Sequence, residues 1–223
     1  MNIGKTYKIC QILNKFFTLC KNEGYWFAIK KALWVTRKLF YSRGEFVIMK
    51  IDIEKNISKT NSIINVKYEF KKLELKDVVL FNHLVKISRI KLFYRRLKNN
   101  EYCFVALKND KIIGYVWVTK MPDKNLDGFE VILFKEEMCL HNLYILPEYR
   151  REGIATTLVL YVINYLNQFG CKYLIALVDK ENVASLKLFK KLQAKETERI
   201  PYKFIFFKRV FSSQRLKYLA WLR

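Results

Sequence analysis

The fold of this chain is decided by the stretch Leu143-Tyr144-Ile145-Leu146-Pro147-Glu148-Tyr149-Arg150-Arg151-Glu152-Gly153-Ile154-Ala155. Its first residues are apolar and typical of a buried strand, and Pro147 marks a turn. The pattern Arg-x-x-Gly-x-Ala then leads into an apolar segment, Thr156 to Phe169, that predicts a long helix. A glycine turn on a helix N-terminus presents unpaired backbone N–H groups and the positive end of the helix dipole. This turn therefore suits a phosphate or pyrophosphate.

The composition of the turn supports the same kind of ligand. Gly153 and Ala155 are small where a ligand must approach the backbone, and Arg150 and Arg151 add positive charge. The stretch resembles motif A of the GNAT acyltransferase superfamily, whose pattern is Q/R-x-x-G-x-G/A and whose ligand is acyl-coenzyme A. Gly153 and Arg150 alone would favour an ordinary strand-to-helix turn. The strand, the turn, the full spacing and the helix together favour coenzyme A.

A second element of the superfamily follows downstream. Cys171 to Val178 is an apolar run of strand length, and Val183 to Leu192 has helical spacing. Asn182-x-x-Ser185-x-x-x-Phe189 resembles the element N-x-x-A-x-x-x-Y, which implies an Asn beside the pantetheine arm and an aromatic ring near the thiol. Asn182 fits a plain helix cap equally well. The residues that the resemblance assigns to coenzyme A are Leu143, Tyr144, Ile145, Arg150, Arg151, Glu152, Gly153, Ile154, Ala155, Thr156, Asn182 and Phe189.

The remaining elements occur in the order that this superfamily requires. Periodicity and turn residues such as Asn109-Asp110-Lys111 predict strands and helices on both sides of the motif. The strands are expected at Glu45–Ile53, Val66–Leu75, Tyr102–Leu107, Ile112–Thr119, Met138–Ile145, Lys195–Ile200 and Lys203–Val210, with a helical segment at Lys76–Leu97.

The resemblance covers about residues 66 to 210 and implies a fold class. We expect an α/β (α+β) fold whose mixed, mostly antiparallel central sheet carries a V-shaped split, with helices on both faces and amphipathic helices at the N-terminus. At 223 residues and 52% hydrophobic, the chain can bury one sizeable core. We therefore expect a basic amphipathic helical extension at 1–44, a GNAT-like acyltransferase domain at 45–210 and a basic aromatic tail at 211–223.

The cysteine and histidine content argues against several classes of protein. The 5 Cys are never spaced as C-x-x-C, and only 2 His accompany them, so neither a zinc site nor a disulfide framework is predicted.

No segment supplies the roughly 20 uninterrupted apolar residues of a membrane span. The N-terminus lacks the pattern of a secretory signal, so we expect a cytoplasmic location.

The formal charge of +22 favours polyanions in general, including coenzyme A, anionic lipid and nucleic acid. Charge alone does not select among them. Residues 1–43 and 211–223 carry Trp, Phe and Leu at helical spacing among Lys and Arg. Such helices lie on membrane surfaces, pack on their own domain or pack on a second copy. A peripheral position at the inner membrane surface and a homodimer are both expectations of this pattern, and nucleic acid ranks below them.

The resemblance implies direct acyl transfer from a thioester to an amine, with no covalent intermediate on the enzyme. A backbone N–H within Leu143–Ile145 would face the thioester oxygen as it gains negative charge. The amine has a free pKa near ~10 and arrives mostly protonated, so a group must remove a proton. The departing thiolate also gains from a proton donor.

The chain departs from the superfamily at the acid and base positions. Phe189 stands where a Tyr proton donor often lies, and Cys139 stands where several relatives carry a Glu that acts as the catalytic base. The remaining catalytic candidates are His141, Glu137 and Tyr144. Alternation along the strand predicts that His141 shares a face with Cys139, Leu143 and Ile145. A histidine satisfied by its neighbours is an equally good interpretation of His141, and a water chain to bulk solvent could replace a dedicated base.

These observations predict an N-acetyltransferase that uses acetyl-coenzyme A and a primary amine of a small-molecule or membrane-proximal acceptor, without a metal. The missing acid and base leave a non-catalytic acyl-coenzyme A sensor as one rival. A basic protein that binds membrane or nucleic acid on the same scaffold is the other. The identity of the acceptor, the acyl chain length and the oligomeric state are not encoded in a readable pattern.

Overall fold

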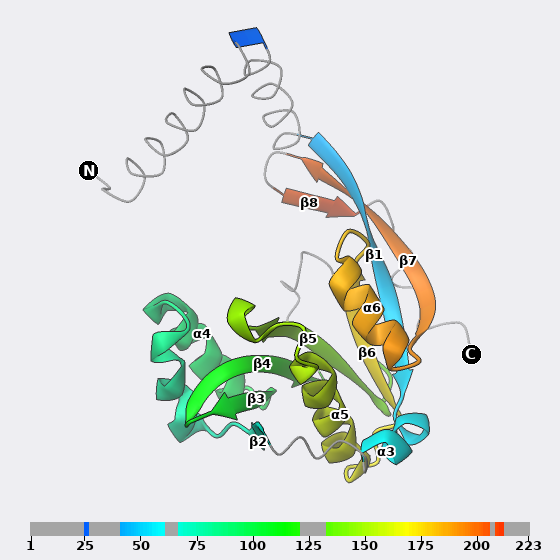
Figure 1. The fold of residues 1–223 in the computed structure, drawn as a ribbon. Coiled ribbons are helices and arrows are strands. Elements are labelled where there is room, and N and C mark those ends of the chain that lie inside the picture. The colour runs from blue at the N-terminus through cyan, green and yellow to red at the C-terminus, as the bar shows by residue number, and fades with distance from the viewer. Residues whose placement is uncertain (1–24, 27–40, 61–66, 121–132, 206–207, 212–223) are drawn as a thin grey trace. The chain divides into compact units, whose positions relative to one another are not determined.

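The structure, a computed structural model, describes residues 25–26, 41–60, 67–120, 133–205 and 208–211 (Figure 1). The chain divides into two compact units. The larger comprises residues 45–201 with 213–223, and the smaller comprises residues 1–44 with 202–212. Most of the predicted extension and tail, 1–24, 27–40 and 212–223, lies outside the described residues.

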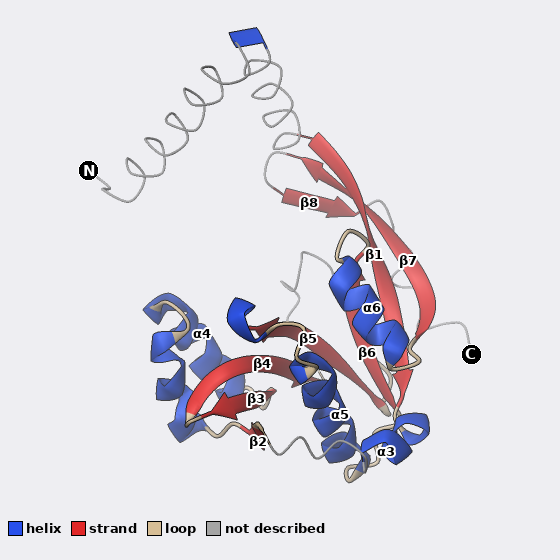
Figure 2. Ribbon diagram, in the orientation of Figure 1, coloured by secondary structure: helices blue, strands red, loops and turns tan. Residues whose placement is uncertain are grey.

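A mixed sheet forms the centre of the larger unit (Figure 2). Its strand order is β2-β3-β4-β5-β6-β1-β7. Pairing is antiparallel between β2 and β3, β3 and β4, β4 and β5, and β6 and β1, whereas β5 and β6 run parallel. The strands are β1 (Tyr41–Asp52), β2 (Glu69–Lys72), β3 (Tyr102–Lys108), β4 (Lys111–Thr119), β5 (Glu137–Ile145), β6 (Tyr173–Asp179) and β7 (Lys195–Ile205).

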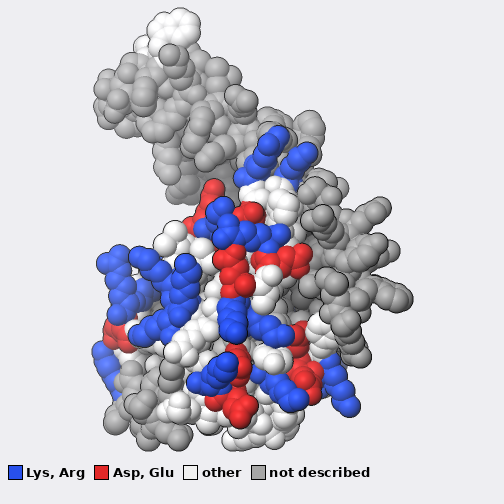
Figure 3. Space-filling model, turned by 90° about the vertical axis from the view of Figure 1, so that its right-hand side faces the viewer, with Lys and Arg blue, Asp and Glu red and all other residues white. Residues whose placement is uncertain are grey.

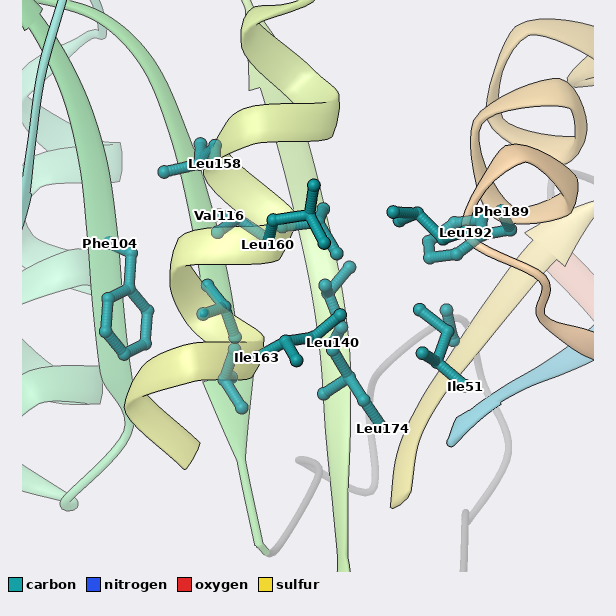
Figure 4. Close-up of a cluster of buried hydrophobic side chains, with 14 of the residues drawn as sticks. Ile51, Phe104, Val116, Leu140, Leu158, Leu160, Ile163, Leu174, Phe189 and Leu192 are labelled. Atoms are coloured by element: carbon teal, nitrogen blue, oxygen red, sulfur yellow. The ribbon is translucent and has the colours of Figure 1, made fainter. Parts of the chain in front are cut away.

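Helices cover both faces of this sheet, because its strands carry apolar residues on both faces. On one face, α5 (Ile154–Asn167) and α6 (Val183–Lys191) enclose a core that includes Phe104, Leu140 and Leu158 (Figure 4). On the other face, η1 (Leu75–His83) and α4 (Ile87–Lys98) enclose a second core around Phe81, Phe93 and Trp117. The short helices α3 (Glu54–Thr60) and η2 (Pro147–Tyr149) complete the described helices.

The smaller unit contains the start of β1, the end of β7, and β8 (Lys208–Phe211). Tyr202 pairs with Phe211, and Ile205 pairs with Lys208, in an antiparallel ladder. Tyr25 and Trp26 adopt a helical conformation and are exposed.

The predicted hairpin and the extra N-terminal strand are confirmed. Asn109 and Asp110, at the tip between β3 and β4, have φ of 49° and 61°. Positive φ at both central residues is the requirement of a tight hairpin turn, and Asn and Asp tolerate it best after Gly. β1 contains the expected strand Glu45–Ile53 except for its last residue.

Three expectations about element boundaries are wrong. The segment Lys76–Leu97 is not one helix, because η1 ends at His83 and α4 begins at Ile87. The predicted strand Lys195–Ile200 continues through Pro201 to Ile205 as β7, since an extended backbone accommodates the fixed φ of proline, and the predicted strand Lys203–Val210 is divided between β7 and β8. The helical extension cannot reach residue 44, because β1 already begins at Tyr41.

In the part of the chain that the structure describes, no helix is long and apolar enough to cross a membrane. The same residues contain no group of three or more His, Cys, Asp or Glu placed to hold a metal ion.

Candidate active site

The central feature of the site is a split between β5 and β6. Their parallel ladder runs from Glu137 opposite Tyr173 to Leu140 opposite Ala176. Beyond this point β5 continues against β4 as far as Ile145, and β6 continues against β1 as far as Asp179. The two strands therefore separate after Leu140, which produces the V-shaped opening expected from the sequence (Figure 1).

A bulge in β5 lies at the start of the split. Tyr144 pairs with Tyr115 and His141 pairs with Trp117, so Asn142 and Leu143 together oppose the single residue Val116. Asn142 has φ of 51°, a left-handed conformation. A bulge takes one residue out of the regular ladder and changes the direction of the backbone groups beside it. The backbone of Leu143 consequently leaves the regular pattern where β5 parts from β6.

A glycine in β4 allows the two strands to meet closely after the bulge. Gly114 pairs with Ile145. A Cβ added at Gly114 would lie 2.4 Å from Ile145 Cδ1 and 3.1 Å from the Tyr144 carbonyl oxygen. A side chain at this position would displace the end of the Ile145 side chain and crowd the Tyr144 carbonyl oxygen, so glycine leaves room for β5 to lie close to β4.

The turn between β5 and α5 has the geometry of an anion site. Arg150 Nε donates to the Ile145 carbonyl oxygen at 3.1 Å, which holds the turn against the end of the strand. Arg151 and Gly153 have φ of 68° and 81°. The first hydrogen bond of the helix runs from Thr157 N–H to the Gly153 carbonyl oxygen at 3.1 Å, so the preceding N–H groups have no partner within the helix.

Among the described residues, no side-chain hydrogen bond caps this end of α5. Gly153 is the N-cap and has no side chain to offer. A Cβ built on Gly153 would meet nothing within 4 Å, so there is open space beside its backbone. An open helix N-terminus with two arginines beside it accommodates a diphosphate.

Glu152 in the same turn is held by the segment just before β2. Lys67 Nζ lies 2.7 Å from Glu152 Oε2, and the Tyr68 hydroxyl donates to the same oxygen. The hydrogen bonds from Lys67 and Tyr68 lower the pKa of the Glu152 carboxyl, and the bond to Glu152 raises the pKa of Lys67. This partnership compensates the negative charge of Glu152.

The remaining residues assigned to coenzyme A take different positions. Leu143 and Ile145 pack into the core beneath α5, and Tyr144 packs on the opposite face against the Tyr115 ring at 5.6 Å. Asn182 caps α6 by accepting from Ser185 N–H at 3.1 Å, at the end of β6 that borders the split. Phe189 is 2% exposed and belongs to the core. Whether Asn182 and Phe189 contact a ligand stays a prediction.

The three catalytic candidates lie at different places along β5. Glu137 is at the closed end of the split, where its carboxylate binds Lys50 Nζ at 2.7 Å and accepts from Phe134 N–H. His141 is at the opening, where its Nε2 lies 3.2 Å from Glu101 Oε2. Tyr144 follows the bulge, with the Arg150 guanidinium 5.8 Å from its ring.

The predicted sharing of faces along β5 is wrong for two residues. Cys139 and His141 lie on the α4 side of the sheet, close to Glu101. The Glu101 carboxylate contributes to the raised pKa of the Cys139 thiol and lies 3.2 Å from His141 Nε2. Leu143 and Ile145 instead pack beneath α5. The bulge adds one residue to the strand and thereby reverses the alternation of the side chains that follow.

Comparison with known proteins agrees with this geometry. A family model described as "Acetyltransferase (GNAT) family" matches residues 69–193, more than half of the chain. The chain belongs to the GNAT acetyltransferase family. The matched segment contains the split, the bulge, the turn at Gly153 and the cap of α6.

Curated relatives match a shorter segment of this GNAT chain. An aminoglycoside N(6′)-acetyltransferase type 1 from Acinetobacter baumannii is 40% identical over 63 residues, which is 28% of this chain and 43% of that enzyme. The chain therefore matches less than half the length of this relative.

Solved structures share the fold at low sequence identity. A tandem GNAT protein from the clavulanic acid biosynthesis pathway has a TM-score of 0.53 at 11% identity, over 72% of this chain and 53% of that one. A GNAT-family acetyltransferase structure from Novosphingobium aromaticivorans has a TM-score of 0.51 at 13% identity, over 72% and 63%. These likenesses support the GNAT fold of the larger unit.

Several residues at this GNAT site were missed by sequence reasoning. Glu101 and Arg96 reach His141 and its neighbour Asn142 from the end of α4 and the turn that follows it. Lys67 and Tyr68 reach Glu152 from a segment more than 80 residues away. Only one signal was available: Glu101 is a carboxylate at the start of an otherwise apolar strand.

Proposed function

We propose that this protein transfers the acetyl group of acetyl-coenzyme A to a primary amine by direct attack, without a covalent intermediate on the enzyme. The observation that supports this most strongly is the opening between β5 and β6, together with the glycine N-cap of α5 and the open space beside its backbone. Acetyl-coenzyme A has a polar diphosphate and a narrow arm that carries the thioester. The N-terminus of α5 offers a place for the diphosphate, and the opening between β5 and β6 offers a place for the arm. Membership of an acetyltransferase family supports the same reaction.

Each part of the site has a chemical task in this proposal. The N–H groups from Arg151 to Thr156 hold the diphosphate, and Arg150 and Arg151 add positive charge. The pantetheine arm follows Leu143–Ile145 toward Asn182. The backbone N–H of Leu143, next to the bulge, donates to the thioester oxygen as negative charge develops there.

We propose a small molecule with a primary amine as the acceptor, with a membrane-proximal amine as the other form of this proposal. The Acinetobacter relative is named an aminoglycoside N(6′)-acetyltransferase, and this activity supports an amine nucleophile. The match to that relative covers only 28% of this chain, so aminoglycosides are one class of acceptor to test among several.

The coenzyme site can be tested with a matched pair of glycine variants. Gly153 and Gly170 lie at opposite ends of α5, both at positive φ, and a Cβ on either meets nothing within 4 Å. Gly153→Asp places a negative charge in front of the helix N-terminus, so it should weaken acetyl-coenzyme A binding at least about 10-fold, or ~1.4 kcal/mol. Gly170→Asp introduces the same charge and similar strain, and should change the dissociation constant less than about twofold. Isothermal titration calorimetry measures both.

If the two variants bind acetyl-coenzyme A with equal affinity, the proposed diphosphate site is wrong. If the unaltered protein does not bind acetyl-coenzyme A, the proposed function is wrong. Turnover is measured as free thiol released from acetyl-coenzyme A with a panel of monoamines, polyamines and aminoglycosides. Binding without thiol release across this panel would favour a non-catalytic acyl-coenzyme A sensor.

A further inference from the structure

A polar cluster with two buried side chains, one partly buried side chain and one exposed side chain lies on the α4 side of the sheet, at the opening of the split. It consists of Arg96, Glu101, His141 and Asn142, and is called the His141 cluster below. The His141 side chain is 4% exposed, that of Glu101 9% and that of Arg96 11%. Asn142, the residue at the bulge, is exposed. Polar groups are taken out of water at a free-energy cost, so a cluster placed here requires an explanation beyond packing.

Both nitrogen atoms of the His141 ring have partners in this cluster. Nε2 lies 3.2 Å from Glu101 Oε2, and Nδ1 lies 3.2 Å from the Asn142 amide. A carboxylate accepts hydrogen bonds, so Glu101 fixes a proton on Nε2. The proton that His141 gains or loses is therefore the one on Nδ1, on the side of the exposed Asn142.

The two orientations of the Asn142 amide are not equivalent. With its nitrogen toward the ring, the amide can donate to Nδ1, but its N–H groups then also face the N–H donors of Arg96, which is unfavourable. With its oxygen toward the ring, that oxygen accepts from Nδ1 at 3.2 Å, and from Arg96 Nη1 at 2.8 Å and Nη2 at 3.2 Å. The second arrangement holds an imidazolium between the Glu101 carboxylate and an amide oxygen.

Two charged groups lie beside His141, one from α4 and one from the segment that follows it. Arg96 lies on α4, and Glu101 follows α4 before β3. Cys103 on β3 and Cys139 on β5 are both buried, which raises the pKa of each thiol, that of Cys139 to about 12. Both thiols are therefore neutral in the range where a histidine titrates, and Trp117 on β4 carries no charge.

We propose that His141 takes the proton that the attacking amine must lose, and that Glu101 is a positioning residue that holds the ring and stabilises its charged form. This inference rests on the proposed acetyl transfer. In the step, an ammonium N–H bond breaks, its electron pair stays on the amine nitrogen, and the proton bonds to Nδ1. Asn142 then accepts a hydrogen bond from Nδ1 through its oxygen. The proton later returns to solvent, so no further reactant is needed.

The titration of His141 tests the role of Glu101 without an acceptor. The chain contains only 2 His, so histidine-selective NMR resolves His141 and His83 directly. Glu101→Gln removes the negative charge and keeps the shape of the side chain. Because the imidazolium then loses its counterion, the midpoint of the His141 titration should move about one pH unit or more toward lower pH. His83 binds the Ile112 carbonyl oxygen instead and should keep its midpoint.

Kinetics test whether this titration controls the reaction. We expect His141→Gln to lower kcat at least about 100-fold while leaving the dissociation constant of acetyl-coenzyme A within about twofold. Glu101→Gln should lower kcat about 10-fold and move the acid limb of the kcat profile in the same direction as the NMR midpoint. Glu101→Asp keeps the charge and should restore the limb toward that of the unaltered enzyme. Glu136→Gln, which removes a surface carboxylate paired with Lys172, provides the reference for an unchanged profile.

Three outcomes would overturn the inference and leave the proposed function intact. The first is that the unaltered enzyme turns over but Glu101→Gln changes neither the NMR midpoint nor the acid limb. The second is an acid limb that moves in Glu137→Gln and not in Glu101→Gln. The third is a His141→Gln variant with unchanged kcat. Absence of acetyl-coenzyme A binding or thiol release in the unaltered protein would instead overturn the proposed function, and this inference with it.

Discussion

Cys139 shows how burial sets the chemistry of a single residue in this protein. It occupies the strand position at which sequence comparison suggested a base, yet it is 2% exposed. Burial, followed by the nearby Glu101 carboxylate, raises the pKa of its thiol to about 12. The thiolate is therefore disfavoured in the folded state, and Cys139 cannot replace a glutamate as a base at neutral pH.

The same pKa predicts a loss of stability in alkali. The unfolded thiol ionises near 9.0 and the folded thiol near 12, so above pH 9 the unfolded state has released a proton that the folded state still holds. The free energy of unfolding should therefore fall with rising pH from about 9 to about 12, by up to ~1.4 kcal/mol per pH unit for this thiol.

Urea unfolding at several pH values measures this slope. Cys139→Ala should reduce the slope, whereas Cys171→Ala, at a half-buried thiol whose pKa is also raised, should reduce it less. A slope that is identical in Cys139→Ala and the unaltered protein would contradict the prediction.

At the scale of elements, the bulge in β5 joins the sheet to the chemistry. It places His141 on one face of the sheet and Leu143 on the other, and it lies where β5 leaves β6. Gly114 keeps β4 close to the residues after the bulge, and Arg96 reaches Asn142 from α4. A change in the bulge should therefore affect catalysis more than it affects the stability of the sheet.

Two substitutions at Asn142 separate backbone from side chain. Asn142→Val puts a β-branched residue at φ of 51° and should cost about 1–2 kcal/mol of stability, with a lower kcat. Asn142→Gly retains the backbone, loses the amide, and should lower kcat with little loss of stability.

Gln193→Val is the matched control, because Gln193 is exposed, has φ of 56° and lies after α6. It should lose similar stability with unchanged kcat in thermal unfolding and steady-state assays. Equal effects of Asn142→Val and Gln193→Val on kcat would show that the bulge has no special role.

At the scale of the whole molecule, the charge of +22 dominates long-range interactions. Lys and Arg are interleaved with Asp and Glu on the face shown in Figure 3. Some of these charges form ion pairs in the structure, such as Lys180–Glu45 at 3.0 Å. The smaller unit adds two exposed aromatic residues, Tyr25 at 72% and Trp26 at 79%. Aromatic rings beside basic residues are characteristic of proteins that bind at a lipid interface.

We propose that the full chain binds anionic vesicles through this region. It should co-sediment with phosphatidylserine-containing vesicles and not with pure phosphatidylcholine, and should dissociate as salt screens the charge. The double variant Tyr25→Ser with Trp26→Ser should bind several-fold more weakly. Phe169→Ser, at a 67% exposed ring beyond α5, is the control and should bind normally. Vesicle binding that is equal in both variants would contradict the proposal, and a dimer that persists without vesicles would favour packing on a second copy.

The sequence by itself determined the elements whose signals are local. The hairpin at Asn109-Asp110, the turn at Gly153 and the helix that follows it depend on residues within a few positions of each other. Positive φ, helix dipoles and short apolar periods are properties of such short segments, so they could be predicted without the fold. The split was predictable only through a family resemblance, since no local pattern marks where two strands separate.

Only the tertiary structure decided which side chains meet at the site. Glu101 and His141 are 40 positions apart, and Lys67 and Glu152 are 85 apart. Their contacts depend on the register of the sheet and on the docking of α4. A single inserted residue at Asn142 reversed the faces that alternation had assigned to Leu143 and Ile145. The order of residues along the chain fixes local backbone geometry, whereas side chains from distant segments are brought together by burial of the shared core.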